Sequence, residues 1–336
     1  GEAMFVRNGV LHLLEQAVPV KFNVWDYMLS TNDAPLQTNY ISNLSTTVID
    51  TANATVVGFN TNGTPIFSPN SPTVSRNTFW VNVADLRDES QEYTFFMLQD
   101  AAFTAETNKL TSFYPSTNPN LNASFYVAKD LAVKGVFPLT KLPDTLVSVT
   151  GGKIPINRAN IVKSYRASNG IVHVVSALPF RLRDKVPAFT IQGENPTGFT
   201  ANRSVLYRVK LDNLNRPFRD IQVYNHGTAE FGIFYTRPNL AVARYRVFAR
   251  AIVGLTGDPQ ITAFTQRYFI FNSPTNLFTL AFTQVVAPLA FNEVLLGEFT
   301  PAQFGNLQLR LTAANSTAQN VNTLALDYLR FEPVLP

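Results

Sequence analysis

The two halves of the chain have different patterns of apolar and polar residues. In residues 20–185, short apolar runs alternate with segments that have helical spacing. Residues 21–29 predict a short helix with Asn23 as its N-cap, and Asp100 is the expected cap of a second helix. Residues 78–83 and 93–98 predict strands, and residues 146–154 predict a hairpin. This mixture indicates an α+β fold.

Strand patterns follow one another closely in residues 186–336. Turn residues separate the strand candidates. A succession of many short strands without helices predicts an all-β region and is typical of a jelly-roll-type β-sandwich. The domain boundary is expected near residue 186. The expected strands are 205–211, 221–224, 229–235, 244–253, 265–271, 278–285, 292–299, 307–313 and 323–331.

A short internal repeat organises the first half. Asn8, Gly9 and His12 recur at the same spacing as Asn169, Gly170 and His173, with apolar residues around each histidine. In both copies we expect the Asn-Gly pair to form a turn with positive φ, followed by a buried strand. Residues 1–19 are therefore interpreted as the closing strand of a preceding domain that is otherwise absent, and residues 20–185 as one domain.

The composition narrows the function classes. Hydrophobic residues make up 46% of the chain and charged residues only 15%, which excludes a disordered, highly charged protein. The net charge of +4 is too dilute for nucleic-acid binding, and the absence of Cys excludes disulfides and thiolate metal sites. No apolar stretch predicts a transmembrane segment. We expect an extracytoplasmic protein on a bacterial cell surface, with the outer membrane as the expected location and a lipoprotein-type anchor outside this sequence.

The repeat resembles the closing strand of fasciclin domains, in which Asn-Gly is followed by two apolar residues and His. A second fasciclin motif is similar to residues 94–103, where Thr94, Phe96, Ala102 and Phe103 match. This resemblance implies a fasciclin domain and a role in cell adhesion. Asp130 and Leu131 replace the Tyr-His pair that is linked to adhesive contacts in animal members, so that activity is not carried over.

The second half is similar to galactose-binding-like carbohydrate-binding modules. The similar segments are residues 191–195, 243–250 and 324–333. The resemblance implies a glycan ligand, adjacent first and last strands, and a structural Ca²⁺ shared by Glu194 and Asp327. The alternative is that these two carboxylates are unrelated surface groups.

Catalytic candidates are few. His12 and His173 belong to the repeat, where a buried, hydrogen-bonded imidazole is the expected role. No spacing fits a helical zinc site, a P-loop or a dinucleotide-binding loop, so we expect no enzyme and no cofactor beyond the candidate Ca²⁺. The expected function is non-catalytic adhesion or interaction with a glycan or a cell-surface or matrix partner. The alternatives are an accessory component of a polysaccharide-degrading system, or a glycoside hydrolase if two carboxylates converge.

A row of arginines is the candidate ligand surface. Arg244, Arg246 and Arg250 share one face of a predicted strand, and Tyr245 and Val247 lie on the other. With Arg237, this row offers guanidinium groups to an acidic glycan. The alternative is an ordinary solvated strand face.

Overall fold

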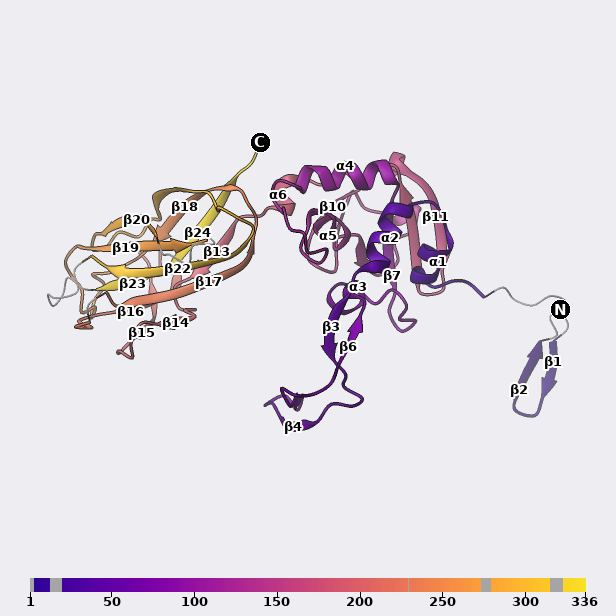
Figure 1. Ribbon diagram of the computed structural model, residues 1–336, viewed down its shortest axis with the longest axis horizontal. Helices are drawn as coiled ribbons and strands as arrows, with labels where there is room; N and C mark the ends of the chain where they lie inside the picture. The colour runs from indigo at the N-terminus through magenta and orange to yellow at the C-terminus, as the bar shows by residue number, and fades with distance from the viewer. Residues whose placement is uncertain (1–2, 13–19, 229, 273–278, 315–322) are drawn as a thin grey trace. The chain divides into compact units, whose positions relative to one another are not determined.

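The computed structural model describes residues 3–12, 20–228, 230–272, 279–314 and 323–336 (Figure 1). The chain divides into two compact units. The first consists of Gly1–Thr107 and Ser124–Phe180, and the second of Asn108–Ala123 and Arg181–Pro336. The second unit therefore begins a few residues before the expected 186, and it also takes a segment from the first half of the chain.

A four-stranded sheet forms the centre of the first unit. Its order is β11-β12-β7-β8, in which β12 and β7 are parallel and the other pairs are antiparallel. All side chains of β7 and β12 are buried, which explains why both strands are nearly continuous apolar runs, interrupted by Thr94 in β7 and His173 in β12. The four strands are β7 (Tyr93–Leu98), β8 (Ala132–Lys134), β11 (Ile161–Ala167) and β12 (Gly170–Val175).

The turn that enters β12 differs from the expected one. Neither Asn169 nor Gly170 has a positive φ, and the same holds for Asn8 and Gly9. Gly170 is needed for another reason, because a Cβ at this position would lie 2.0 Å from the carbonyl oxygen of Tyr93 on the parallel strand. Close approach of two backbones therefore explains this glycine.

In the described part of the first half of the chain, five α-helices and further hairpins accompany this sheet. The predicted hairpin at 146–154 is confirmed as β9 (Thr145–Val147) and β10 (Lys153–Pro155). The helices are α1 (Val24–Ser30), α2 (Pro35–Asn43), α3 (Thr78–Asn82), α4 (Asp100–Leu110) and α5 (Ala123–Ala128).

Three helix predictions have different outcomes. The α1 prediction is confirmed, and Asn23 accepts a hydrogen bond from the Asp26 backbone N–H. Asp100 lies in the first turn of α4, and its carboxylate instead accepts the backbone N–H of Leu36 at the start of α2. The strand prediction for 78–83 is wrong: the segment is α3, because Asn77 caps its first turn.

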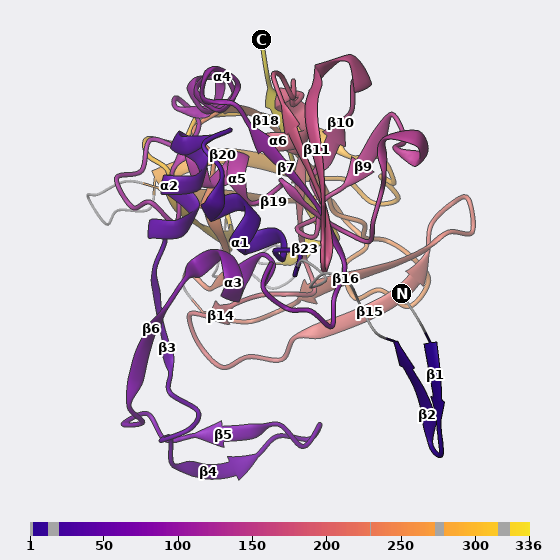
Figure 2. The same ribbon diagram turned by 90° about the vertical axis from the view of Figure 1, so that its right-hand side faces the viewer.

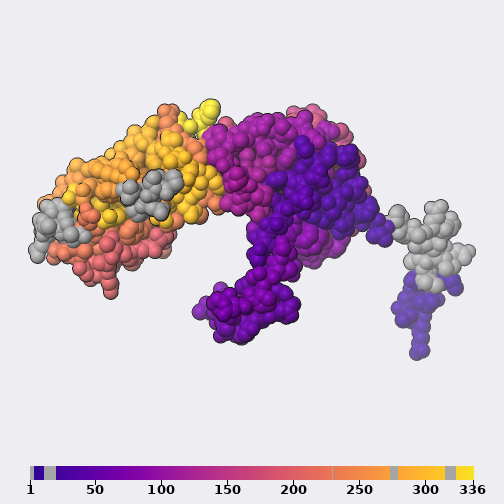
Figure 3. Space-filling view, viewed as in Figure 1, coloured from indigo at the N-terminus to yellow at the C-terminus, as the bar shows by residue number. Residues whose placement is uncertain are grey.

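A ribbon of paired strands leads away from the helices of the first unit (Figure 2). It is built from two hairpin-like pairs, and Figure 3 shows it standing clear of the rest of that unit. Val57 and Phe59 near its tip are 61% and 67% exposed. The pairs are β3 (Thr46–Ile49) with β6 (Thr73–Arg76), and β4 (Val56–Phe59) with β5 (Pro65–Phe67).

The first copy of the repeat forms a hairpin of its own. β1 (Ala3–Val6) pairs with β2 (Gly9–His12), and Val6 faces Gly9 as Ala167 faces Gly170 in the second copy. The two copies therefore share their turn register. Residues 1–2 and 13–19 lie outside the described residues, and the assignment of 1–19 to a preceding domain stays a prediction.

The second unit is a β-sandwich whose described strand pairs are all antiparallel. Its sheets have the orders β13-β24-β18-β21, β14-β17-β22-β19-β20 and β15-β16-β23. A short helix, α6 (Leu182–Lys185), precedes them. The strands are β13 (Phe189–Gln192), β14 (Gly198–Phe199), β15 (Leu206–Leu211), β16 (Pro217–Val223), β17 (Gly232–Leu240), β18 (Arg244–Arg250), β19 (Phe264–Phe271), β20 (Thr279–Val286), β21 (Val294–Phe299), β22 (Gly305–Ala313), β23 (Leu324–Leu326) and β24 (Tyr328–Val334).

Alternating burial along the strands builds the sandwich core. In β18, Tyr245, Val247 and Ala249 are buried, whereas the residues between them are exposed or half-buried. Tyr235 and Tyr268 contribute the same kind of buried aromatic from the five-stranded sheet. The sequence predicts this inward face of β18 correctly, because period two places alternate residues on one face.

The segment 108–123 packs within the second unit. The Val242 backbone N–H donates to the Phe113 carbonyl at 2.9 Å, and the Tyr114 hydroxyl donates to the Lys185 carbonyl at 2.5 Å. The Tyr114 ring also meets the Phe304 ring at a centroid distance of 5.7 Å. These contacts make the segment part of the sandwich unit. Among the described residues, no helix has the length and apolar character needed to span a membrane.

Candidate functional site

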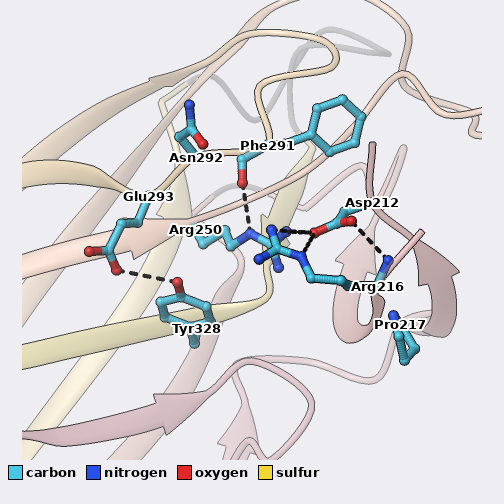
Figure 4. Close-up of a pocket in the computed structure, with 8 residues that line it drawn as sticks. All are labelled: Asp212, Arg216, Pro217, Arg250, Phe291, Asn292, Glu293 and Tyr328. Carbon is cyan, nitrogen blue, oxygen red and sulfur yellow. Dashed lines mark hydrogen bonds and ion pairs between the residues drawn. The ribbon is translucent and has the colours of Figure 1, made fainter. Parts of the chain in front are cut away.

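A pocket of about 380 Å³ opens in the β-sandwich where four chain segments meet (Figure 4). The segments are the β15–β16 turn, the end of β18, the stretch before β21 and the start of β24. Its walls combine two aromatic residues with charged and amide groups, and in Figure 4 the Phe291 carbonyl points toward Arg250 while its ring points away. The lining residues are Asp212, Arg216, Pro217, Arg250, Phe291, Asn292, Glu293 and Tyr328.

The β15–β16 turn orients Asp212 and Arg216. Asn215 has a φ of 56°, the left-handed conformation that Asn tolerates well, and this closes the turn tightly. The Asp212 Oδ1 atom accepts the backbone N–H groups of Leu214 at 2.9 Å and Arg216 at 3.0 Å. Its Oδ2 atom accepts Nε of Arg216 at 3.0 Å. One carboxylate therefore shapes the turn and holds the Arg216 side chain.

The Arg250 guanidinium is fixed by three chain segments. Nε donates to the Phe291 carbonyl at 2.8 Å, Nη1 to Asp327 at 2.6 Å, and Nη2 to Asp212 at 3.1 Å. Its side chain is 11% exposed. Because the five donors of the guanidinium lie in one plane, these three bonds fix its orientation and leave the remaining N–H groups for other acceptors.

Glu293 lies beside Tyr328 in Figure 4, at the opposite side of the pocket from Asp212 and Arg216. Arg330 binds both of its carboxylate oxygens, at 2.5 Å and 3.1 Å, and the Tyr328 hydroxyl donates to Oε2 at 3.2 Å. Bidentate pairing of this kind gives a fixed geometry. The hydrogen bond from Arg330 lowers the pKa of Glu293 below its ordinary value, so the group stays ionised near neutral pH.

The two carboxylates that hold Arg250 have opposite pKa shifts. Burial works against ionisation of Asp212, but hydrogen bonds from the backbone and side chain of Arg216 outweigh it and lower the pKa to about 2. At Asp327, burial dominates over the Arg250 hydrogen bond and raises the pKa to about 6. At neutral pH Asp212 is therefore fully ionised and Asp327 largely so.

The predicted arginine row is only partly in this pocket. Arg250 lines it, but Arg244 and Arg246 pair with acids on the outer sheet face, Glu298 at 3.5 Å and Glu332 at 3.2 Å. Arg237 lies on β17 with its guanidinium 5.1 Å from the centre of the Phe189 ring. The row is therefore largely charge-compensated.

Glu194 follows β13 and Asp327 precedes β24, and these first and last strands are neighbours, as the resemblance implies. β13 pairs with β24, and the Gly193 N–H donates to the Asp327 carbonyl at 2.6 Å. The negative charge of Glu194 contributes to the raised pKa of Asp327, whose carboxylate binds Arg250. Among the described residues, no three His, Asp or Glu side chains form a group that could hold a metal ion. The Ca²⁺ site stays a prediction.

The repeat residues in the first unit make internal hydrogen bonds. His173 is fully buried; its Nδ1 lies 2.7 Å from the Ser164 hydroxyl and its Nε2 2.9 Å from the Phe137 carbonyl. The two partners lie on the neighbouring strand β11 and in the segment that follows β8. Burial lowers the pKa of His173. The side chain of His12 lies outside the described residues.

The other motif residues tie the sheet to its surroundings. Asn169 accepts the Val24 N–H at 2.8 Å and donates to the Leu86 and Asp88 carbonyls. Thr94 donates to the Gly135 carbonyl at 2.8 Å. Phe96, Ala102 and Phe103 are buried.

Most of the pocket residues were missed by sequence reasoning. Asp212, Arg216 and Asn292 stand in polar turns that look like ordinary connections. The run of Phe291, Asn292 and Glu293 is the clearest available signal, because it joins an aromatic, an amide and an acid in a turn. Its convergence with Arg250 depends on the sheet order, which one sequence does not reveal.

No protein-family model and no curated protein sequence matches the chain. Among solved structures, the chain is similar to a carbohydrate-binding module of Cellvibrio mixtus lichenase 5A in complex with cellotriose, with 11% identity and a TM-score of 0.27, covering 44% of this chain and 98% of that one. It is also similar to a xylan-binding domain of Paenibacillus barcinonensis Xyn10C, with 13% identity and a TM-score of 0.30, covering 44% of this chain and 95% of that one. These likenesses are too weak to carry an argument about the site.

Proposed function

We propose that the β-sandwich unit binds glycans in the pocket around Arg250. The observation that carries this proposal is the combination of the Tyr328 ring with planar polar groups held in fixed orientations. A sugar ring presents apolar C–H faces to aromatic residues and pairs of hydroxyls to guanidinium, carboxylate and amide groups. Arg250, Glu293 and Asn292 supply those three group types.

The site is proposed to bind without catalysis. Glycoside hydrolysis requires a carboxylic acid with a raised pKa that donates a proton to the leaving group. The two carboxylates in the lining, Asp212 and Glu293, both have lowered pKa values and are held by arginines. Asp327, whose pKa is raised to about 6, is bound to Arg250 and does not line the pocket. Prolonged incubation with the glycans that bind, followed by detection of new reducing ends, tests this; release of reducing ends would favour the hydrolase alternative.

A glycan array with the full chain tests binding. Arg216→Ala removes a pocket guanidinium whose side chain is 66% exposed, so the fold should tolerate it. Arg244→Ala is the matched control, because Arg244 is 56% exposed and pairs with one acid outside the pocket. We expect the Arg216 variant to lose array signal and the Arg244 variant to retain it. Equal signals from the two variants would show that the pocket is not the glycan site.

We also propose that residues 20–185 are a fasciclin-type domain in a non-catalytic adhesion protein at a bacterial cell surface. Supporting this, β12 and β7 bring the two resembling motifs side by side, with His173 opposite Phe96. Retention of the full chain on cells or matrix, with and without a competing glycan, separates two roles. Retention that survives competition favours adhesion through the first unit, and its loss favours a polysaccharide-binding accessory component.

A further inference from the structure

The arginines that reach the pocket are already matched by acids. Asp212 contacts both of them, through Nη2 of Arg216 at 2.8 Å and Nη2 of Arg250 at 3.1 Å. Asp327 contacts Arg250 a second time at 2.6 Å. Two cations therefore face two carboxylates on this side of the pocket.

The opposite side of the pocket is balanced in the same way. Glu293 is bound by Arg330 through both oxygens, and Arg330 also contacts Glu332 at 3.0 Å. Glu332 in turn pairs with Arg246 at 3.2 Å. The charges continue in alternation along the outer face of the sheet, so the pocket has no excess positive charge on this side either.

We infer that this pocket selects neutral sugars and discriminates against uronic acids. The inference rests on the proposed glycan site and specifies its ligand class. A ligand carboxylate would lose water close to Asp212 and Glu293 without gaining an unpaired cation, and like charges in a partly buried site repel. Neutral hydroxyls avoid this cost, since they donate to carboxylate lone pairs and accept the remaining guanidinium N–H groups.

Calorimetric titration of the full chain tests the selection. The neutral probes are hexasaccharides of β-linked glucose, xylose and galactose, and the acidic probe is hexagalacturonate. Each is titrated at about 50 mM and about 500 mM NaCl, because screening weakens charge-driven binding. We expect the best neutral probe to bind with little change between the two salt concentrations. Hexagalacturonate should bind at least about tenfold more weakly, a factor that corresponds to about 1.4 kcal/mol.

Two isosteric variants test the origin of the selection. Asp327→Asn leaves one excess positive charge on the Arg216 and Arg250 side of the pocket, and Glu293→Gln leaves one on the Arg330 side. The preference is the Kd of hexagalacturonate divided by the Kd of the best neutral probe. Each variant should lower this ratio at least about threefold at low salt, with less effect at high salt. Glu298→Gln is the control, since it frees Arg244 outside the pocket. Thermal unfolding of every variant identifies any that fails to fold. If one pocket variant fails to fold, the binding preference of the other pocket variant decides whether the inference holds.

The outcomes separate the two proposals. Tighter binding of hexagalacturonate that high salt removes would overturn the selection of neutral sugars and leave glycan binding intact. Folded pocket variants with the same preference as the parent, or an equal change in the Glu298 control, would also overturn it. Binding of none of the probes would overturn glycan binding and, with it, the inference.

Discussion

Asp212 and Arg250 form an ion pair with Oδ2 and Nη2 3.1 Å apart, although the turn that carries Asp212 joins two strands of a different sheet from β18. The turn after β15 supplies the acid and the end of β18 supplies the base. The Asp212 side chain is 2% exposed, so the pair is largely shielded from water. This pair connects the turn that carries Arg216 to the strand that forms the pocket wall.

The acid stability of the fold should depend on Asp212. Its pKa is about 2 in the folded chain against an ordinary value of 3.8, so its stabilising contribution is present above pH 4 and is lost as the pH falls toward 2. Asp212→Asn should remove this dependence, as measured by denaturant unfolding over that range. Asp144→Asn, at a carboxylate that is 87% exposed, is the control. Identical acid profiles for the Asp212 variant and the parent would contradict the assignment.

Asp327 should have the opposite effect on stability. Because burial raises its pKa from 3.8 to about 6, its contribution is present below pH 4 and is lost as the pH rises through 6. Arg250 opposes the shift, while Asp220 and Glu194 add to it. The difference in melting temperature between Asp327→Asn and the parent should therefore change between pH 4 and pH 7 in favour of the variant. A difference that stays constant would refute the raised pKa.

Two glycines at equivalent places in the repeat should respond differently to alanine. Gly170→Ala places a methyl group 2.0 Å from the Tyr93 carbonyl oxygen, whereas a Cβ at Gly9 meets no atom within 4 Å. We expect Gly170→Ala to lower the free energy of unfolding by about 1–3 kcal/mol, the usual range for overpacking. Gly9→Ala should change it by less than about 0.5 kcal/mol. Urea unfolding checks both, and equal effects would show that β12 and β7 do not approach so closely.

His173 should be important for stability and not for binding. Its pKa is lowered from 6.5 by burial, so the neutral ring stabilises the fold above pH 6.5 and this contribution is lost as the pH falls. His173→Gln should cost about 1–3 kcal/mol, because the partners at Ser164 and Phe137 lose a buried hydrogen bond. Unfolding at pH 7 and pH 5 measures both effects. A His173→Gln variant with unchanged stability that is no longer retained on cells or matrix would contradict the structural role of His173.

Local patterns predict elements well where the side chains alone decide the structure. The strand 93–98, the Asn23 cap and the inward face of β18 all follow from spacing and capping chemistry. The same reasoning fails at 78–83, where the Asn77 cap outweighs a run of residues with strand propensity. It also fails to find β13 and β14, which are short and contain few alternating positions.

The pocket depends on contacts that local patterns do not contain. The sequence pattern indicates Arg250 as a candidate because it shares a strand face with Arg244 and Arg246. It does not identify the acids that pair with these arginines in the structure. Glu332 and Glu298 face β18 only because β24 and β21 flank it in the sheet. The arginines that form a basic row in the sequence are therefore each paired with an acid on a neighbouring segment in the structure.

The segment 108–123 means that the chain passes between the two units at three places, after Thr107, Ala123 and Phe180. A protease cut at the last of these would leave one fragment that still carries Phe113 and Tyr114 bound to Val242 and Lys185 of the other. Such a nicked protein should elute as a single species until denaturant is added. A gene truncated to residues 186–336 would lack this segment and leave the surface around Phe304 open to aggregation.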